Sequence, residues 1–486
     1  MEKTLRKLTA LTLCILLALS CCLPGFTAAA AEGEEAETPT YTAPTNLPAM
    51  YVNLENNFPQ ENIDKENWVP ANISLVGAEG YDDLIEVAGN MKGRGNYSWS
   101  AEKKPYGLKF NKKTDLLGMG KAKKWVLIAN YWDKTMLRNY ITLTLAADMG
   151  LKYTTEVRFI DLYVNGVYRG NYLLTEKVEI GKERVNIDDE NGGVLFEIEQ
   201  EYRHNSECDY CHQTPSGVHL TYKEPEYESD EEGEIFNTAF IQNMMNTMNP
   251  ILDTIDTSLS QGYDAYSKYI DVQSFVDWYI LNEFTKNYDS QFVTSCYCYY
   301  DPKDGLLHMG PAWDYDTCYG NQSGDGYGVP EGYLISTGSP WYRMLMSDES
   351  FLKLVKERWT ELKANGTIYS CMQYILNGSK LIAASQVLNN EAWPNMLLTD
   401  GPRGGKQNVY YTYKEEVDYL RKFVAMRTLW LDEEWNVSPE TTANKLDNIN
   451  MIAGGLLLDN SMAIDDSYFT KAYELYTSLS DEEKAT

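Results

Sequence analysis

Basic residues are scarce in this sequence: 42 Lys and Arg stand against 71 Asp and Glu, which gives a formal net charge of −29. A protein with this excess of negative charge repels nucleic acid and anionic membrane surfaces. The composition therefore argues against nucleic acid as a partner. Any site for phosphate groups must rest on a local cluster of Lys and Arg, helped by metal ions.

Long apolar runs are also missing beyond the N-terminus, where no stretch reaches the roughly 18 apolar residues of a membrane span. The N-terminus has three basic residues before an apolar run at 8–19, and small residues at 28–31 offer a cleavage site. This pattern is typical of a secretory signal peptide. We therefore predict a signal peptide at 1–31, a flexible spacer at 32–46, and a secreted or cell-surface protein without a transmembrane span. A lipid-anchored start is the alternative to release.

Cysteine is sparse as well, with nine in the chain and three of them inside the predicted signal peptide. The even number that remains permits disulfides outside the cell. Cys208 and Cys211 lie between His204 and His212, a spacing that allows a zinc site, a small disulfide or two free thiols. We favour a surface insertion without tightly bound zinc.

Hydrophobic periodicity divides the chain into a strand-rich part and a helical part. Alternation and turn signals indicate strands between 50 and 199, with a hairpin around Asn165-Gly166 and one helix at 134–149. An acidic loop is expected at 222–235. The helices expected after it are 235–259, 272–286, 347–364, 367–388 and 413–434. This order predicts an α+β fold of two lobes, sheet-rich first and mostly helical second.

Two carboxylates mark the ends of a short predicted hairpin. The helix at 272–286 ends before Asn287-Tyr288-Asp289, two β-type runs follow, and a turn then carries Trp313-Asp314-Tyr315-Asp316. Because a hairpin folds its ends together, we expect Asp289 and Asp314 to share a cleft. Such a pair suits phosphoryl transfer, in which one Asp orients the attacking hydroxyl and the other holds Mg²⁺. The alternative is that Asp289 caps a helix end and the turn acids are ordinary turn residues.

A strand predicted at 104–110 separates core residues from residues that can line a cleft. The apolar residues of even number face the core together with Lys104, whereas Gly107 and Lys109 face the other way. Because Gly107 has no side chain, we predict that Lys109 reaches the phosphates of a ligand there. The same role for Lys104 requires a bulge. The alternative for Lys109 is a solvent-exposed side chain.

Six pieces of sequence occur in series: GRGNYSW with KKPYGLKF, WVLIANYWDKTMLRNYITLTLAADMGL, LYVNGVYRGNYLLTEKVEIGKERV, LTYKEPE, NYDS and GPAWDYDTCYGN. Together they resemble one family, the secreted spore-coat kinases of the CotH type, which are distant relatives of the protein kinase fold. The resemblance spans roughly Tyr51 to Trp430. It places a kinase-like domain at 47–435, with an N-terminal lobe at 47–200 and a C-terminal lobe at 201–435.

The resemblance implies an ATP-dependent kinase that uses Mg²⁺ or Mn²⁺ and phosphorylates a protein substrate rich in Ser and Thr. In this likeness Asp289 is the catalytic Asp, Asp314 is the metal-binding Asp, and Asp316 is a helper for the metal. The substrate class that the family suggests is a spore coat or surface protein.

The resemblance also implies a set of nucleotide-binding residues. Those that would cover the phosphates are Arg94, Gly95, Asn96 and Ser98. Lys109 or Lys104 would pair with the phosphates, and the segment from Glu176 to Val178 would contact adenine.

Two departures from ordinary kinases keep other functions open. The position five residues after Asp289, where ordinary kinases have a metal-binding Asn, is Thr294, with Asn287 nearby as a substitute. The helix at 134–149 also contains no Glu to pair with the kinase Lys. A catalytically inactive scaffold or binding protein of the same fold is therefore the alternative. The 37 Tyr and 11 Trp also allow an adhesive or carbohydrate-active surface protein.

The C-terminal end departs from the family pattern. We expect a polar linker at 436–466 and a helical appendage at 467–486 that looks like one truncated repeat.

Overall fold

The computed structural model describes seven stretches of the chain: 41–201, 210–225, 238–322, 326–398, 412–437, 442–456 and 466–485. The predicted signal peptide and most of the predicted spacer lie outside these stretches. The same holds for His204, Cys208 and the larger part of the predicted acidic loop.

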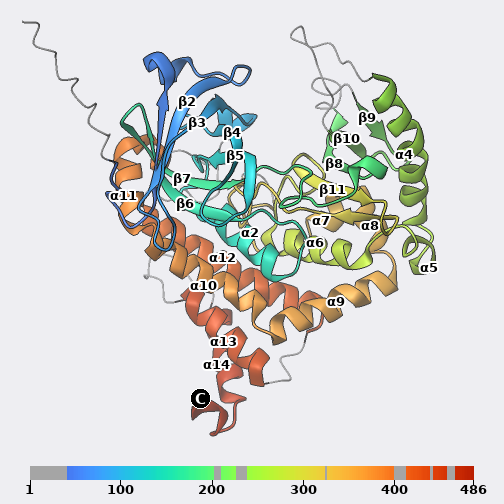
Figure 1. The fold of residues 1–486 in the computed structure, drawn as a ribbon. Helices are drawn as coiled ribbons and strands as arrows, with labels where there is room; N and C mark the ends of the chain where they lie inside the picture. Colours follow the sequence, from blue (N-terminus) through green and yellow to red (C-terminus); the bar gives the residue numbers. More distant parts are fainter. Residues whose placement is uncertain are drawn as a thin grey trace, which may run out of the picture. The chain divides into compact units, whose positions relative to one another are not determined.

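Seven strands close into a barrel, drawn in blue to blue-green in Figure 1. The strands are β1 (Ala49–Leu54), β2 (Val69–Val76), β3 (Leu84–Gly93), β4 (Tyr106–Asp115), β5 (Lys121–Ile128), β6 (Val157–Val164) and β7 (Val167–Glu176). Their order is β1-β2-β3-β4-β5-β7-β6, and a parallel pairing of β1 with β6 closes the barrel while all other pairs are antiparallel. Because the strands contribute alternate residues to the inside, the interior is filled by a continuous apolar cluster.

Two local predictions for these strands are confirmed. Asn165 and Gly166 both have positive φ, 49° and 74°, and join β6 to β7 as a tight hairpin. In β4, Leu108 and Phe110 are fully buried, whereas Gly107 and Lys109 on the other face are partly exposed.

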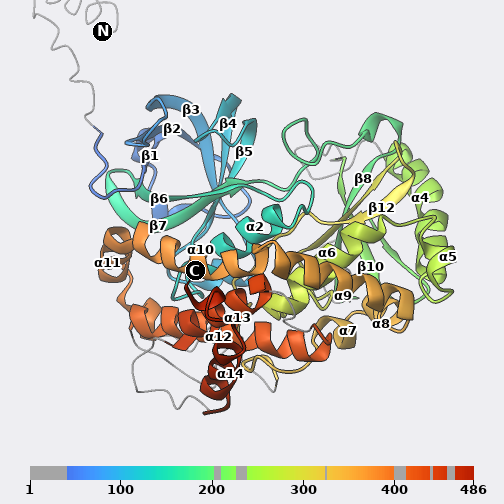
Figure 2. The same cartoon turned by 90° about the horizontal axis from the view of Figure 1, so that it is seen from below.

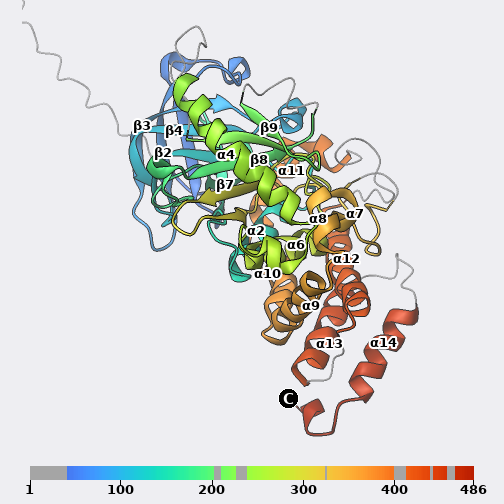
Figure 3. The same ribbon diagram turned by 90° about the vertical axis from the view of Figure 1, so that its right-hand side faces the viewer.

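A second sheet of five strands follows the barrel in the chain. Its strands are β8 (Val194–Glu199), β9 (Cys211–Gln213), β10 (His219–Glu224), β11 (Cys296–Asp301) and β12 (Leu306–Met309). They are ordered β12-β11-β8-β10-β9, so that β8 pairs with β11 about a hundred residues further along. Helix α4 (Thr238–Ser258) lies across this sheet in Figure 3, and the Tyr222 hydroxyl donates a hydrogen bond to Asn249 Oδ1 at 2.6 Å.

This second sheet corrects the start of the predicted acidic loop. Tyr222 is only 1% exposed and packs in the core, and the residues up to Glu224 belong to β10. The acidic composition concealed the strand because its inward residues, Leu220 and Tyr222, alternate with polar ones over a very short run.

Helices form most of the remaining chain (Figure 2). Those not yet named are α2 (Arg138–Asp148), α5 (Tyr263–Tyr266), α6 (Val272–Thr285), α7 (Ile335–Gly338), α8 (Pro340–Leu345), α9 (Glu349–Ala364), α10 (Thr367–Leu381), α11 (Ala383–Ala392), α12 (Tyr413–Glu434), α13 (Thr442–Leu456) and α14 (Asp466–Thr477). Short 3₁₀ helices occur at Glu55–Asn57, Gln60–Asn62, Tyr97–Ser100, Asp189–Asn191, Pro394–Leu398 and Glu483–Ala485. Helix α10 packs against α2, and α11 packs against β7 of the barrel. The predicted α+β class is confirmed, with a sheet-rich N-terminal part and a helical C-terminal part.

Two predicted helices have different bounds in the structure. Helix α2 begins at Arg138 rather than at 134, because the Asp133 carboxylate accepts hydrogen bonds from the backbone N–H groups of Thr135 and Arg138 and holds an extra turn. The helix predicted at 367–388 is broken at Ile382, whose side chain is fully buried. After this break α11 reaches the barrel, where Ser385 Oγ donates to Asp161 Oδ1 at 2.5 Å.

The predicted polar linker at 436–466 is wrong for its central part, which forms α13. Asp447 Oδ2 lies 2.8 Å from the buried ammonium of Lys363 on α9, and Met451 and Ile452 are buried. These contacts give the segment a packed face that its polar composition did not indicate. Helix α14 forms where a helix was predicted and packs against α13. Among the described residues, no helix is long and apolar enough to cross a membrane.

Candidate active site

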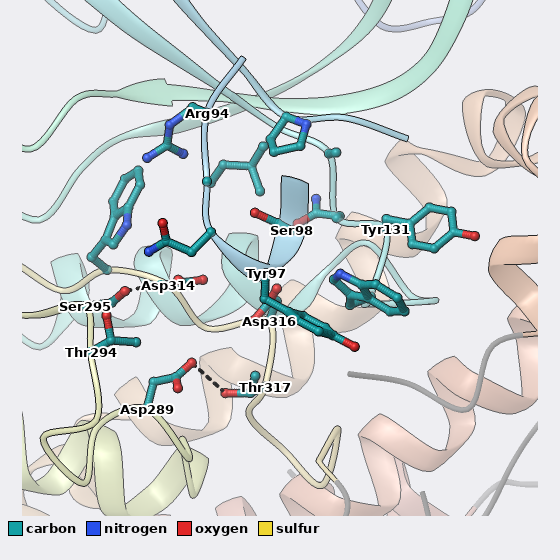
Figure 4. A pocket seen from close by; sticks show the side chains of 18 of the residues that line it. Arg94, Tyr97, Ser98, Tyr131, Asp289, Thr294, Ser295, Asp314, Asp316 and Thr317 are labelled. Carbon is teal, nitrogen blue, oxygen red and sulfur yellow. Dashed lines mark hydrogen bonds between the residues drawn. The ribbon is translucent and has the colours of Figure 1, made fainter. Parts of the chain in front are cut away.

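A cavity of about 330 Å³ lies where the loop between β3 and β4 faces the loops that follow α6 and β12 (Figure 4). Seven of the predicted site residues line it: Arg94, Gly95, Asn96, Ser98, Asp289, Asp314 and Asp316. We call the 94–98 loop the roof and the segments 287–295 and 313–317 the acidic floor. The structure therefore brings together the predicted phosphate loop and all three predicted aspartates.

The first part of the floor follows the end of α6. Lys286 ends this helix with a left-handed backbone, φ 48°, and its ammonium donates to the carbonyl oxygens of Gly326, Val329 and Glu331. The next residue, Asn287, is buried, and its side-chain nitrogen donates to the Asp314 carbonyl oxygen at 3.1 Å. This bond ties the two halves of the floor together.

Thr317 makes a second tie between the halves. Its hydroxyl lies 2.8 Å from Asn287 Oδ1 and 3.5 Å from Asp289 Oδ2, the latter at the long limit of a hydrogen bond (Figure 4). Asp289 is 7% exposed, so its carboxylate sits at the cavity wall rather than in open solvent. The expectation that Asp289 and Asp314 share one cleft is confirmed.

The second part of the floor is held in an unusual conformation. Asp314 has φ 65°, a left-handed backbone that non-glycine residues seldom adopt. Ser295 Oγ donates to Asp314 Oδ2 at 3.2 Å, and Asn139 Oδ1 on α2 accepts the backbone N–H of Tyr315 at 2.7 Å. Such a conformation persists only where the surrounding contacts hold it in place. Residues with this kind of backbone strain concentrate at functional sites.

The floor carries concentrated negative charge. Burial, together with the nearby Asp314 and Asp289 carboxylates, raises the pKa of Asp316 well above its usual value. Arg138 opposes this rise, but its guanidinium is engaged by Asp133 at 2.5 Å. The arrangement favours the arrival of a cation or of a proton.

The roof is built on a glycine and an aromatic contact. Gly95 has φ 85°, and a Cβ at this position would lie 2.2 Å from Ser98 Oγ. The Arg94 guanidinium lies over the Trp313 ring, 5.5 Å from its centroid, and so joins roof to floor. Burial lowers the pKa of Arg94, and Tyr297 and Asp314 oppose this effect.

Four predicted nucleotide-binding residues do not line this cavity. Lys104 Nζ instead donates to the Trp99 carbonyl oxygen at 2.6 Å, and Lys109 Nζ lies 5.9 Å from the Trp68 ring centroid. The β4 alternation is correct, but the outer face of the strand faces Trp68 and not the acidic floor.

Glu176 and Val178 line a separate cavity of about 280 Å³. There Glu176 forms an ion pair with Arg184, and burial raises the pKa of Glu176 to about 7. The sequence predicts that Glu176 lies at the end of a strand. It does not predict that Glu176 lines a different cavity from the acidic floor.

Several cavity residues were absent from the sequence prediction. They include Tyr97, Lys103, Glu197, Lys223, Ser295 and Thr317. Lys223 lies in the LTYKEPE string, so the family likeness pointed to its segment without assigning it a part. Ser295 and Thr317 flank the predicted Asp residues but have no spacing signal of their own.

Metal ligands are limited in number. Across the described stretches, no group of three or more His, Cys, Asp or Glu side chains is arranged to hold a metal ion. Mg²⁺ needs no such group, since it is commonly held by one or two carboxylates together with substrate phosphates and water. Asp314 and Asp316 fit this smaller requirement. Asn287, the substitute for the missing kinase Asn, is committed to contacts with Ser290, Asp314 and Thr317.

The predicted zinc alternative has only one half within the described residues. His212 Nε2 lies 2.7 Å from Asp253 Oδ1 on α4, while His204 and Cys208 lie outside those residues.

The chain was compared with known proteins. One curated relative, the inner spore coat protein H of Bacillus subtilis (strain 168), is 25% identical over 230 residues. The match covers 47% of this chain and 58% of the relative, less than two thirds of its length. A family model described as CotH kinase protein matches residues 91–431, which include every residue lining the cavity. Because this match covers well over half of the sequence, the chain belongs to the CotH kinase protein family.

Proposed function

We propose that this protein is an ATP-dependent kinase that phosphorylates Ser or Thr hydroxyls of a protein, with Mg²⁺ or Mn²⁺ as the metal. The observation that carries the proposal is the convergence of Asp289, Asp314 and Asp316 on one cavity beneath the Arg94 roof. Phosphoryl transfer relies almost entirely on positioning and electrostatic stabilisation. An acidic floor opposite a cationic roof supplies both.

The arrangement of the fold supports the same proposal. The barrel contributes the roof and lies within the proposed N-terminal lobe at 47–200, while the floor belongs to the proposed C-terminal lobe at 201–435. A nucleotide between the two would meet the 94–98 loop on one side and carboxylates on the other. This is the sense in which we propose a two-lobed kinase-like arrangement.

Asp289 is suited to the substrate hydroxyl. Thr317 and the buried loop after α6 fix its position, and it faces the cavity with little exposure. A carboxylate in this position would orient the hydroxyl and accept its proton as the hydroxyl oxygen bonds to the γ-phosphorus of ATP and the bond to the departing ADP breaks.

Asp314 and Asp316 are suited to the metal. Ser295 holds the Asp314 carboxylate, and burial, together with the neighbouring carboxylates, raises the pKa of Asp316. When bound, Mg²⁺ would neutralise charge on the transferred phosphoryl group. The residues of this chain would orient it through these two carboxylates.

The proposed substrate rests on the likeness, and the proposed location rests on the likeness and on the N-terminal sequence. The relative is named as an inner spore coat protein, and the predicted signal peptide points to export. We propose a coat or surface protein rich in Ser and Thr as the substrate.

The test is to incubate the mature protein with labelled ATP, Mg²⁺ or Mn²⁺, and Ser-rich coat proteins. Label transfer to Ser or Thr that disappears in Asp289→Asn and Asp314→Asn is expected. Absence of transfer by the wild-type protein with every metal and substrate, despite nucleotide binding, would favour the alternative.

That alternative is an inactive scaffold that keeps the fold. The observation in its favour is that Thr294 lines the cavity where ordinary kinases have a metal-binding Asn, while the Asn287 side chain is used within the protein. An inactive scaffold of this kind would bind nucleotide in the presence of metal but would not transfer phosphate.

A further inference from the structure

The acidic cavity contains few cations that can meet a phosphate. Three line it within the described stretches: Arg94, Lys103 and Lys223. Lys103 is fully buried, and its ammonium donates to the Asn171 carbonyl oxygen and to Asn389 Oδ1. It therefore joins the barrel to α11 and is already used by the fold.

Lys223 is placed differently. It lies on β10, its side chain is 38% exposed, and its ammonium is 2.9 Å from Glu197 Oε2 on the neighbouring strand β8. The Glu197 side chain is only 8% exposed, so its buried carboxylate holds the Lys223 ammonium in place. Lys223 thus lines the cavity with its ammonium positioned beside Glu197.

Glu197 also connects this lysine to the floor. Its Oε1 accepts the backbone N–H of Ser295 at 3.0 Å, and the Ser295 hydroxyl donates to Asp314 Oδ2 at 3.2 Å. The same carboxylate therefore positions the Lys223 ammonium and the residue that holds Asp314. Through Glu197 and Ser295, the Lys223 ammonium is therefore linked to the carboxylate of Asp314, the proposed metal ligand.

Resting on the proposed function, we propose that Lys223 binds the nucleotide phosphates and that Glu197 is its positioning residue. Neither Lys104 nor Lys109 lines the cavity. We therefore assign the role of pairing with the phosphates to Lys223 in the second sheet instead of a lysine in β4. An ammonium is a compact charge on a flexible stem, which suits contact with phosphate oxygens. It would also offset the repulsion between the phosphates and the three aspartates.

The experiment compares nucleotide binding by the full mature chain and two matched variants in Mg²⁺ buffer. Lys223→Met removes the charge but keeps an apolar stem. Lys124→Met is the control, because Lys124 is also partly exposed, at 26%, forms an ion pair with Glu179 at 3.8 Å, and lines neither cavity. Affinities for ATP and adenosine are measured by competition against a fluorescent nucleotide.

We expect Lys223→Met to weaken ATP binding by at least about tenfold and to leave adenosine binding unchanged. Lys124→Met should bind both like the wild type. An equal loss for ATP and adenosine would overturn the proposal, since it would indicate a structural role in the sheet. Lys223→Arg, which keeps the charge, should retain most of the ATP affinity, and its failure to do so would count against charge pairing.

The positioning part of Glu197 is tested with Glu197→Gln. Alone, it should weaken ATP binding less than Lys223→Met, and added to Lys223→Met it should not weaken binding further. Fully additive losses would overturn the positioning role.

The outcomes separate this inference from the proposed function. If wild-type protein binds ATP and transfers phosphate while Lys223→Met behaves like Lys124→Met, only the inference about Lys223 fails. If the wild type binds no nucleotide with either metal, the proposed function fails and this inference fails with it.

Discussion

The roof and the floor of the cavity are built in different ways. The floor is crossed by side-chain hydrogen bonds from Asn287, Thr317, Ser295 and Asn139, several of them buried. The roof has a backbone bond from Arg94 N to the Pro105 carbonyl oxygen, a short 3₁₀ turn, and ring contacts of Arg94 with Trp313 and of Tyr97 with Trp132. A floor that must hold several carboxylates together needs this scaffold, because their mutual repulsion would otherwise move them apart. The roof carries no such cluster of like charges.

The largest effects are expected from the floor carboxylates. Asp289→Asn and Asp314→Asn should each lower kcat/KM for phosphoryl transfer by at least about 10³-fold, which corresponds to about 4 kcal/mol. Asp314→Asn should also weaken Mg-nucleotide binding, whereas Asp289→Asn should act on kcat. Steady-state kinetics together with nucleotide titrations measure both effects. Equal losses of nucleotide affinity in the two variants would show that the roles of Asp289 and Asp314 are wrongly assigned.

Breaking a floor tie should have the next largest effect. Asn287→Ala removes the bond to the Asp314 carbonyl and leaves buried groups without partners, which costs about 1–3 kcal/mol of stability. The phosphoryl-transfer activity should also fall, because the segments 287–295 and 313–317 are no longer held in fixed positions relative to each other. Thermal unfolding and kcat are the measurements, and Asn246→Ala, an exposed Asn on α4, is the control. A stable Asn287→Ala with full activity would remove the contrast between floor and roof.

A roof substitution should cost less. Gly95→Ala forces a side chain into a left-handed backbone and against Ser98, at a cost of about 1–2 kcal/mol. Nucleotide affinity is expected to fall by roughly tenfold at most. Gly166→Ala is the matched control, since Gly166 also has positive φ but an open surrounding. The control should lose stability alone, and a similar loss of affinity there would show that the effect is not local.

The smallest effects are expected from the β4 lysines. Lys104→Ala and Lys109→Ala should each change KM for ATP by less than about twofold, or roughly 0.4 kcal/mol, because both side chains lie outside the cavity. Parallel ATP titrations of the two variants test this. A tenfold effect of Lys109→Ala would restore the expectation from strand alternation and would require the roof to move toward β4.

The second sheet shows why the lysine that lines the cavity could not be identified from the local sequence pattern. Alternation in β4 correctly separated Leu108 and Phe110 from Gly107 and Lys109. Alternation says which residues share a face, but not what that face meets. Here the outer face meets Trp68, while the lysine at the cavity comes from β10, whose strand the acidic composition concealed.

The sequence by itself determined the α+β class, the Asn165-Gly166 hairpin and the pairing of Asp289 with Asp314 in one cleft, because each depends on periodicity, turn chemistry or a short hairpin. The tertiary structure decided the closing of the barrel, the break at Ile382 and the joining of Glu197 and Lys223 to the floor. These features depend on contacts between segments far apart in the chain, which are selected by packing and leave no mark in local spacing.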